Sequence, residues 1–139
     1  MKIKSYYLIT LLLITGVAFG SIKPFPVTAA TIEWKGYKIA YERWGTIELE
    51  SGELDFEDGI LTGGNFVVDM TTIQVTSLEG GKKANLEKHL RSDDFFGVKQ
   101  FPNATMVITR VKKTADGYTV TGDFTIKGQT HPVIFPMTI

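Results

Sequence analysis

Residues 88–102 read Lys-His-Leu-Arg-Ser-Asp-Asp-Phe-Phe-Gly-Val-Lys-Gln-Phe-Pro, and this stretch decides how the rest of the chain is arranged. It is the one segment after the amino terminus that is helix-like and lacks the alternating pattern of a strand. Leu86 and Leu90 lie four residues apart and share a helix face, and Pro102 ends the segment because proline disfavours helix at the residue before it. The adjacent rings of Phe95 and Phe96 are typical of a cover over an apolar surface. We therefore expect a short helix and an aromatic lid at one end of a β structure.

The sequence on both sides of this segment is typical of β-strands. Residues 118–127 show the clearest pattern, because apolar side chains alternate there with threonine, aspartate and lysine. Asp58-Gly59 is a strong hairpin signal. The expected strands span residues 31–41, 46–56, 60–71, 104–111, 118–127 and 133–139. Six strands joined mostly by hairpins, with one helix between the third and fourth, predict an all-β antiparallel fold that must close on itself or stack on another sheet.

The alternation also predicts which side chains share the inward face. The step from Leu49 to Leu54 is odd, so a bulge must realign the two faces of the second strand. The expected inward apolar residues are Phe66, Val68, Met70, Met106, Ile108, Val120, Phe124, Ile126, Val133, Phe135 and Met137. Side chains alone can fill a small barrel, whereas methionines and glycines leave adaptable space. The pattern is therefore compatible with a ligand cavity and with a filled interior.

Two motifs resemble a known family. HLRSDDFFGVKQFPNAT at residues 89–105 and VTGDFTIKGQTHPV at residues 120–133 closely resemble the YceI-like family of bacterial polyisoprenoid-binding proteins. The resemblance covers roughly residues 31–139. It implies a lipocalin-like antiparallel β-barrel that holds a long-chain isoprenoid of polyprenyl or quinone type, with the inward residues and the lid residues Leu90, Phe95 and Phe96 as the lipid site. It also implies no cofactor other than this lipid.

The family's barrel continues with further strands after the segment that resembles residues 132–139. We therefore expect six visible strands of an incomplete barrel, from a fragment of a longer barrel or from a member that has lost strands. Such a sheet would have unpaired edges. Edges of this kind predict poor solubility or a homodimer formed by strand pairing.

The first thirty residues are typical of an export signal and a linker. Lys2 and Lys4 precede a largely apolar run from Tyr6 to Phe19, and Ala18-Phe19-Gly20 carries small residues at the positions that a signal peptidase requires. The run is short for a membrane span. We expect a signal peptide over 1–20, a linker over 21–30 and a barrel domain over 31–139. The mature protein would be periplasmic or secreted, with no stable membrane span.

Composition narrows the function classes further. The 139 residues are 43% hydrophobic and 22% charged, which is ordinary for one globular domain. Fifteen basic and fifteen acidic residues show no basic face for nucleic acid. The chain has no cysteine, and His89 and His131 lack partners at metal-ligand spacing. We expect no catalysis and no metal, and the alternative to lipid binding is a protein-interaction module with a filled barrel.

Overall fold

The computed structural model describes residues 20–139, so the predicted signal peptide lies outside the described residues except for Gly20. Seven strands and one helix follow one another along the chain. They are β1 (Lys23–Pro26), β2 (Ile32–Lys38), β3 (Tyr41–Glu57), β4 (Ile60–Val75), α1 (Gly80–Arg91), β5 (Asn103–Lys113), β6 (Tyr118–Ile126) and β7 (Gln129–Met137). The predicted antiparallel all-β fold with one inserted helix is confirmed.

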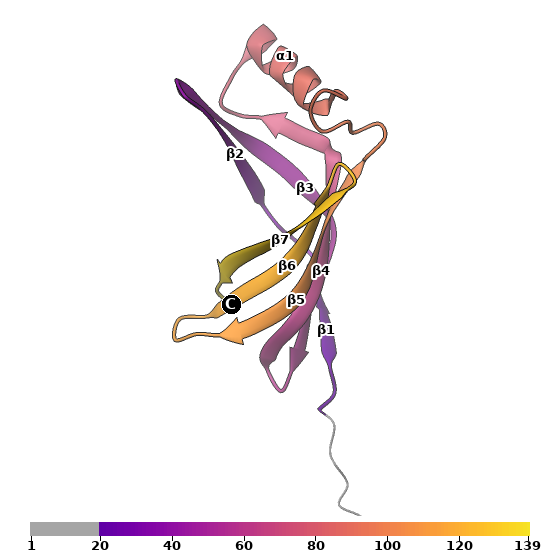
Figure 1. Cartoon of the computed structure of the whole chain (residues 1–139), viewed down its shortest axis with the longest axis vertical. Helices are drawn as coiled ribbons and strands as arrows, with labels where there is room; N and C mark the ends of the chain where they lie inside the picture. The colour runs from indigo at the N-terminus through magenta and orange to yellow at the C-terminus, as the bar shows by residue number, and fades with distance from the viewer. Residues whose placement is uncertain (1–19) are drawn as a thin grey trace, which may run out of the picture.

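The strands form one antiparallel sheet in the order β1-β3-β4-β5-β6-β7. β2 also pairs with β3, along residues 41–47, whereas β1 pairs with residues 53–56 farther along the same strand. Figure 1 shows a curved sheet with α1 and the tip of the β2–β3 hairpin at one end, and β1 towards the other. The sheet does not close within the described residues, since β7 ends the order and pairs only with β6.

The structure corrects the predicted strand count, because residues 23–26 of the expected linker form β1. This strand pairs with Glu53–Phe56, and the ring of Phe25 contacts Phe56 edge-on at a centroid distance of 5.4 Å. All four residues of β1 are exposed, and two of them are prolines. A short exposed segment of this composition has the sequence pattern of a loop. β1 is recognised as a strand only through its pairing with β3.

Two hairpins use turn residues that suit their geometry. Asp58 and Gly59 both have positive φ, as do Lys127 and Gly128, and such two-residue turns match the right-handed twist of the flanking strands. The predicted bulge is confirmed by the register shift between Leu49 and Ser51.

The register of β7 determines what its free edge presents. Residues opposite one another in an antiparallel pair alternate between hydrogen-bonded and non-bonded positions. The two-residue turn makes Gln129 a hydrogen-bonded partner of Ile126, so the odd-numbered residues of β7 bond to β6. The even-numbered residues direct their backbone groups towards the free edge. Pro132 and Pro136 both occupy even-numbered positions.

The apolar side chains form two separate clusters. The cluster nearer α1 has seven buried members, which are Ile47, Met70, Ile73, Val75, Leu90, Val98 and Ala104. The other cluster centres on Leu61, Ile108 and Val120 and is packed by partly buried neighbours that include Phe66 and Phe135. These clusters are called the helix-end cluster and the far-end cluster below.

Candidate functional site

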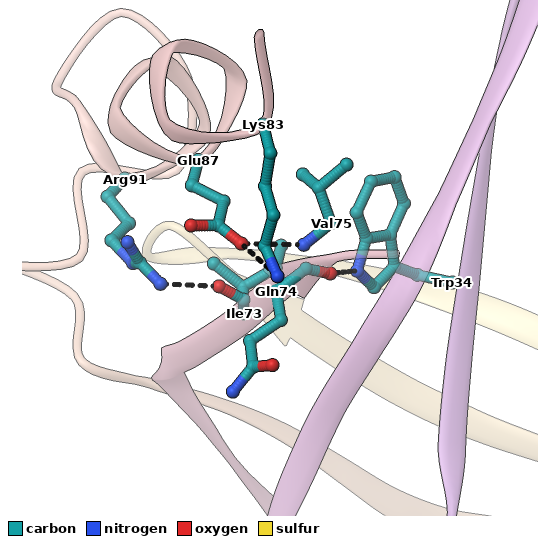
Figure 2. A network of polar contacts seen from close by, with 7 residues as sticks. All are labelled: Trp34, Ile73, Gln74, Val75, Lys83, Glu87 and Arg91. Atoms are coloured by element: carbon teal, nitrogen blue, oxygen red, sulfur yellow. Dashed lines mark hydrogen bonds and ion pairs between the residues drawn. The ribbon is translucent and has the colours of Figure 1, made fainter. Parts of the chain in front are cut away.

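The site begins with the way α1 is fixed against β4. Only Leu90 of this helix is buried, so its apolar contact with the sheet is narrow. Polar contacts add to that contact: Val75 donates its backbone N–H to Glu87 Oε1 at 2.9 Å, and Arg91 Nη2 donates to the carbonyl of Ile73 at 2.6 Å. Lys83 lies 3.8 Å from the same Glu87 oxygen. Figure 2 shows α1 side chains reaching the last residues of β4.

The other side of the same β4 segment receives a contact from β2. Trp34 Nε1 donates to the carbonyl of Gln74 at 3.1 Å (Figure 2). A Cβ at Gly45 would lie 2.8 Å from the Trp34 ring and 1.8 Å from the Gln74 carbonyl oxygen, so the glycine is required for this close approach. The polar network therefore joins β2, β4 and α1 at one end of the sheet.

The segment after α1 supplies the aromatic cover that the sequence predicts. Ser92 Oγ donates to the carbonyl of His89 at 2.7 Å and ends the helix. Phe95 and Phe96 then meet edge-on at a centroid distance of 4.6 Å, and His89 lies 5.8 Å from Phe95. Lys127 Nζ donates to the carbonyl of Asp93 at 2.6 Å, so the cover is attached to the β6–β7 turn.

These elements surround a cavity of about 850 Å³. Its apolar wall comes from the sheet, from α1 and from the aromatic cover. The apolar and aromatic lining residues are Ile32, Trp34, Tyr37, Tyr41, Ile47, Val68, Met70, Ile73, Leu78, Leu86, Leu90, Phe95, Phe96, Ala104, Phe124 and Ile126. Ligand pockets in proteins span about 300–1,000 Å³ and are mostly apolar, so this cavity has the size and lining of a binding site.

The polar lining of the cavity is basic. Lys35, Lys38, Arg43, Lys82 and His89 line it together with Asn85, and no aspartate or glutamate does so. Arg43 lies over the Tyr41 ring at 4.2 Å from the centroid, and Lys38 lies 5.8 Å from the same centroid. The cavity is thus apolar inside, with cationic side chains from the β2–β3 hairpin and from α1.

Half of the predicted site residues line the cavity. They are Val68, Met70, Leu90, Phe95, Phe96, Phe124 and Ile126. The structure brings the predicted lid and part of the predicted inward face together.

The other predicted site residues do not line this cavity. Phe66, Ile108, Val120, Phe135 and Met137 belong to the far-end cluster, while Met106 and Val133 are half-buried on the same sheet. The glycines that were expected to leave space there are covered. A Cβ at Gly122 would lie 2.7 Å from the Met106 sulfur, and one at Gly64 would lie 2.5 Å from the carbonyl oxygen of Glu53. The far-end cluster is packed by its own side chains.

The residues predicted for the site include none from β2 or β3. Ile32, Trp34 and Ile47 line the cavity, and the register of the β2–β3 hairpin places Ile32 opposite Ile47. The alternation within residues 31–41 could have indicated this face. The turn at Ile39-Ala40 contains none of the usual turn residues, so the sequence did not define the register.

Within residues 20–139, none of the helical structure has the length and apolar character that a membrane span requires. The same residues contain no group of three or more histidine, aspartate or glutamate side chains placed to hold a metal ion.

The fold is a small antiparallel β sheet with a largely apolar cavity beside α1 and the aromatic cover. The family model for the YceI-like domain matches residues 25–139. The chain belongs to the YceI-like family, and the predicted family resemblance is confirmed.

Two curated relatives support the same assignment. The UPF0312 protein plu2095 of Photorhabdus laumondii is 46% identical over 103 residues, covering 74% of this chain and 50% of the relative. A UPF0312 protein of Pseudomonas putida is 34% identical over 114 residues, covering 78% of this chain and 56% of the relative. A crystal structure of a YCEI protein from Campylobacter jejuni aligns with a TM-score of 0.47 and 16% identity, over 95% of this chain and 66% of that one. The chain spans about half the length of the curated relatives it matches.

Proposed function

We propose that this protein binds a long-chain isoprenoid lipid, of polyprenyl or quinone type, in the cavity at the helix end of the sheet. The observation that carries the proposal is the 850 Å³ space bounded largely by apolar and aromatic side chains. An isoprenoid tail has no polar handle, so an apolar cavity that excludes water is sufficient to hold it. No catalytic group is needed.

The energetics are adequate for stable binding. Burial of about 500 Å² of tail at roughly 25 cal/mol per Å² gives a gross gain of about 12 kcal/mol. Ordering of the tail and loss of translational freedom reduce this gain. The remainder supports a carrier that sequesters the lipid and releases it again, and we place such a carrier in the periplasm or outside the cell.

Organic extraction of the purified full chain, followed by mass spectrometry, tests the proposal. We expect an isoprenoid lipid in the extract, and we expect Val68→Phe, which adds bulk to the cavity wall, to lower the amount per mole of protein. Titration of a delipidated Trp44→Phe variant with a polyprenyl compound should change the fluorescence of the remaining Trp34, which lines the cavity. An extract without lipid, together with no fluorescence response, would instead favour a non-catalytic interaction module.

A further inference from the structure

The tip of the β2–β3 hairpin is an apolar turn in full contact with solvent. Ile39 and Ala40 connect the two strands, and Ile39 is 111% exposed relative to a reference chain. Tyr37 is 74% exposed, and Tyr41 and Trp44 are each 46% exposed. Burial in the described fold therefore does not account for this group of apolar and aromatic side chains.

The sequence of this turn differs from that of the other two-residue hairpin turns. Asp58-Gly59 and Lys127-Gly128 are polar and adopt positive φ, as twisted hairpins require. Neither Ile39 nor Ala40 has positive φ among the described residues, and neither is a usual turn former. Positions where local sequence preference conflicts with the fold are often functional.

The apolar tip is surrounded by positive charge. Lys35, Lys38 and Arg43 lie on the two strands just behind it, and Glu42 is the one acidic residue among 35–43, which gives this segment a net charge of +2. Glu42 pairs with Lys35 at 3.6 Å, so Lys38 and Arg43 remain as cations stacked on the Tyr41 ring.

This combination fits one type of surface. Tyrosine and tryptophan favour the interface between water and lipid, an isoleucine at the tip can enter the acyl region, and lysine and arginine attract anionic headgroups while their stems remain in apolar surroundings. We propose that the hairpin segment 35–44 docks on an anionic bilayer surface, with Ile39 inserted and Lys38 and Arg43 at the headgroups.

The same hairpin forms part of the cavity wall. Gly36, Tyr37, Lys38, Tyr41 and Arg43 all belong to its lining, so docking of the tip would bring this side of the cavity close to the membrane surface. A tail could then pass between bilayer and cavity with little exposure to water. Docking itself does not depend on the proposed cavity ligand, because it requires only the hairpin residues.

Vesicle co-sedimentation of the full chain tests the proposal. We compare vesicles of phosphatidylcholine with vesicles that contain equal parts of phosphatidylglycerol and phosphatidylcholine. We expect binding to the anionic vesicles that weakens with added salt. Ile39→Asp should lower the association constant about tenfold or more, and Lys38→Gln should lower it roughly fivefold.

The matched control is Ile134→Asp on β7. Ile134 is 72% exposed and lies outside the hairpin, so this substitution removes a comparable exposed side chain and should leave vesicle binding unchanged. In a Trp34→Phe variant, which keeps Trp44 as its one tryptophan, quenching of the fluorescence by brominated phosphatidylglycerol vesicles locates the contact at the hairpin. Absence of binding to anionic vesicles, or equal losses for Ile39→Asp and Ile134→Asp, would overturn the proposal. Lipid found in the extract of the purified protein would still support the proposed cavity ligand, whether or not the hairpin docks on vesicles.

Discussion

The two ends of the sheet use the same kinds of side chain in different ways. At the far end, Leu61 and Val120 are 2% and 0% exposed, and Phe66 and Met106 occupy the space over glycines. At the helix end, Phe124 and Ile126 border a cavity of about 850 Å³. One alternating pattern therefore contributes to a packed apolar cluster at one end and to a cavity at the other. The difference arises from what faces the sheet: other strands and their side chains, or a helix that is attached by polar contacts.

The largest expected effect is the loss of a far-end core side chain. Leu61→Ala should lower the free energy of unfolding by about 2–5 kcal/mol, because it removes a buried side chain and leaves a cavity. Leu86→Ala removes the same atoms from α1 beside the existing cavity, so we expect a loss nearer 1 kcal/mol. Urea unfolding of both variants gives the two values. Equal losses would show that the two ends are packed alike.

Larger side chains should also affect the two ends of the sheet differently. Val120→Phe overpacks the far-end cluster and should lower the free energy of unfolding by about 1–3 kcal/mol. Val68→Phe makes the same change in the cavity wall, where space is present, and should cost less than about 1 kcal/mol while it reduces the bound lipid. Thermal unfolding and lipid extraction of both variants test this pair. Greater destabilisation by Val68→Phe would contradict the assignment of the cavity.

A smaller effect is expected for the polar network beneath α1. Glu87→Ala removes the acceptor for the backbone N–H of the fully buried Val75. This change should lower the free energy of unfolding by about 1 kcal/mol. Lys83→Ala removes only the partly exposed ion pair, which is worth less than about 0.5 kcal/mol. Hydrogen exchange of the α1 amides should increase for Glu87→Ala and change little for Lys83→Ala. The reverse order would show that the ion pair holds the helix.

The smallest effect on stability is expected for exposed side chains at the two ends. Phe95 and Ile60 are each 44% exposed, so Phe95→Ser and Ile60→Ser should each change the free energy of unfolding by about 0.5 kcal/mol or less. Only Phe95 lines the cavity, so Phe95→Ser alone should accelerate lipid release to acceptor vesicles. Equal release rates for both variants would show that Phe95 does not help to retain the lipid.

Much of the fold could be predicted from the sequence because most of the long strands show their alternating pattern within a few consecutive residues. Residues 118–127 show their alternation within ten positions, and the turn at residues 58–59 carries its own signal. β1 could not be predicted, because its four residues have no inward face and are defined only by their pairing with β3. The same holds for the register across Ile39-Ala40, which places Trp34 and Ile47 in the wall of the site.

Only part of the candidate site could be predicted from the sequence, and the reason is physical. Alternation shows which side chains face inward, but it does not show whether another side chain occupies the space in front of them. Val120 and Phe124 share one face of β6, yet Val120 is in the far-end cluster and Phe124 borders the cavity. Whether such a side chain is packed or borders the cavity depends on the position of α1. Contacts of Glu87 and Arg91 with β4 hold α1 in place, and no local sequence pattern encodes these contacts.

The register of β7 has a consequence for self-association. Two of its four outward backbone positions are prolines, so this edge offers carbonyl oxygens at every outward residue but N–H groups only at Thr130 and Ile134. Stacking of identical strands requires each copy to donate as often as it accepts, and two β7 edges facing one another would both lack donors. The edge is therefore poorly suited to fibril growth or to a homodimer formed by β7 pairing. A strand that pairs well with it must itself supply most of the donors.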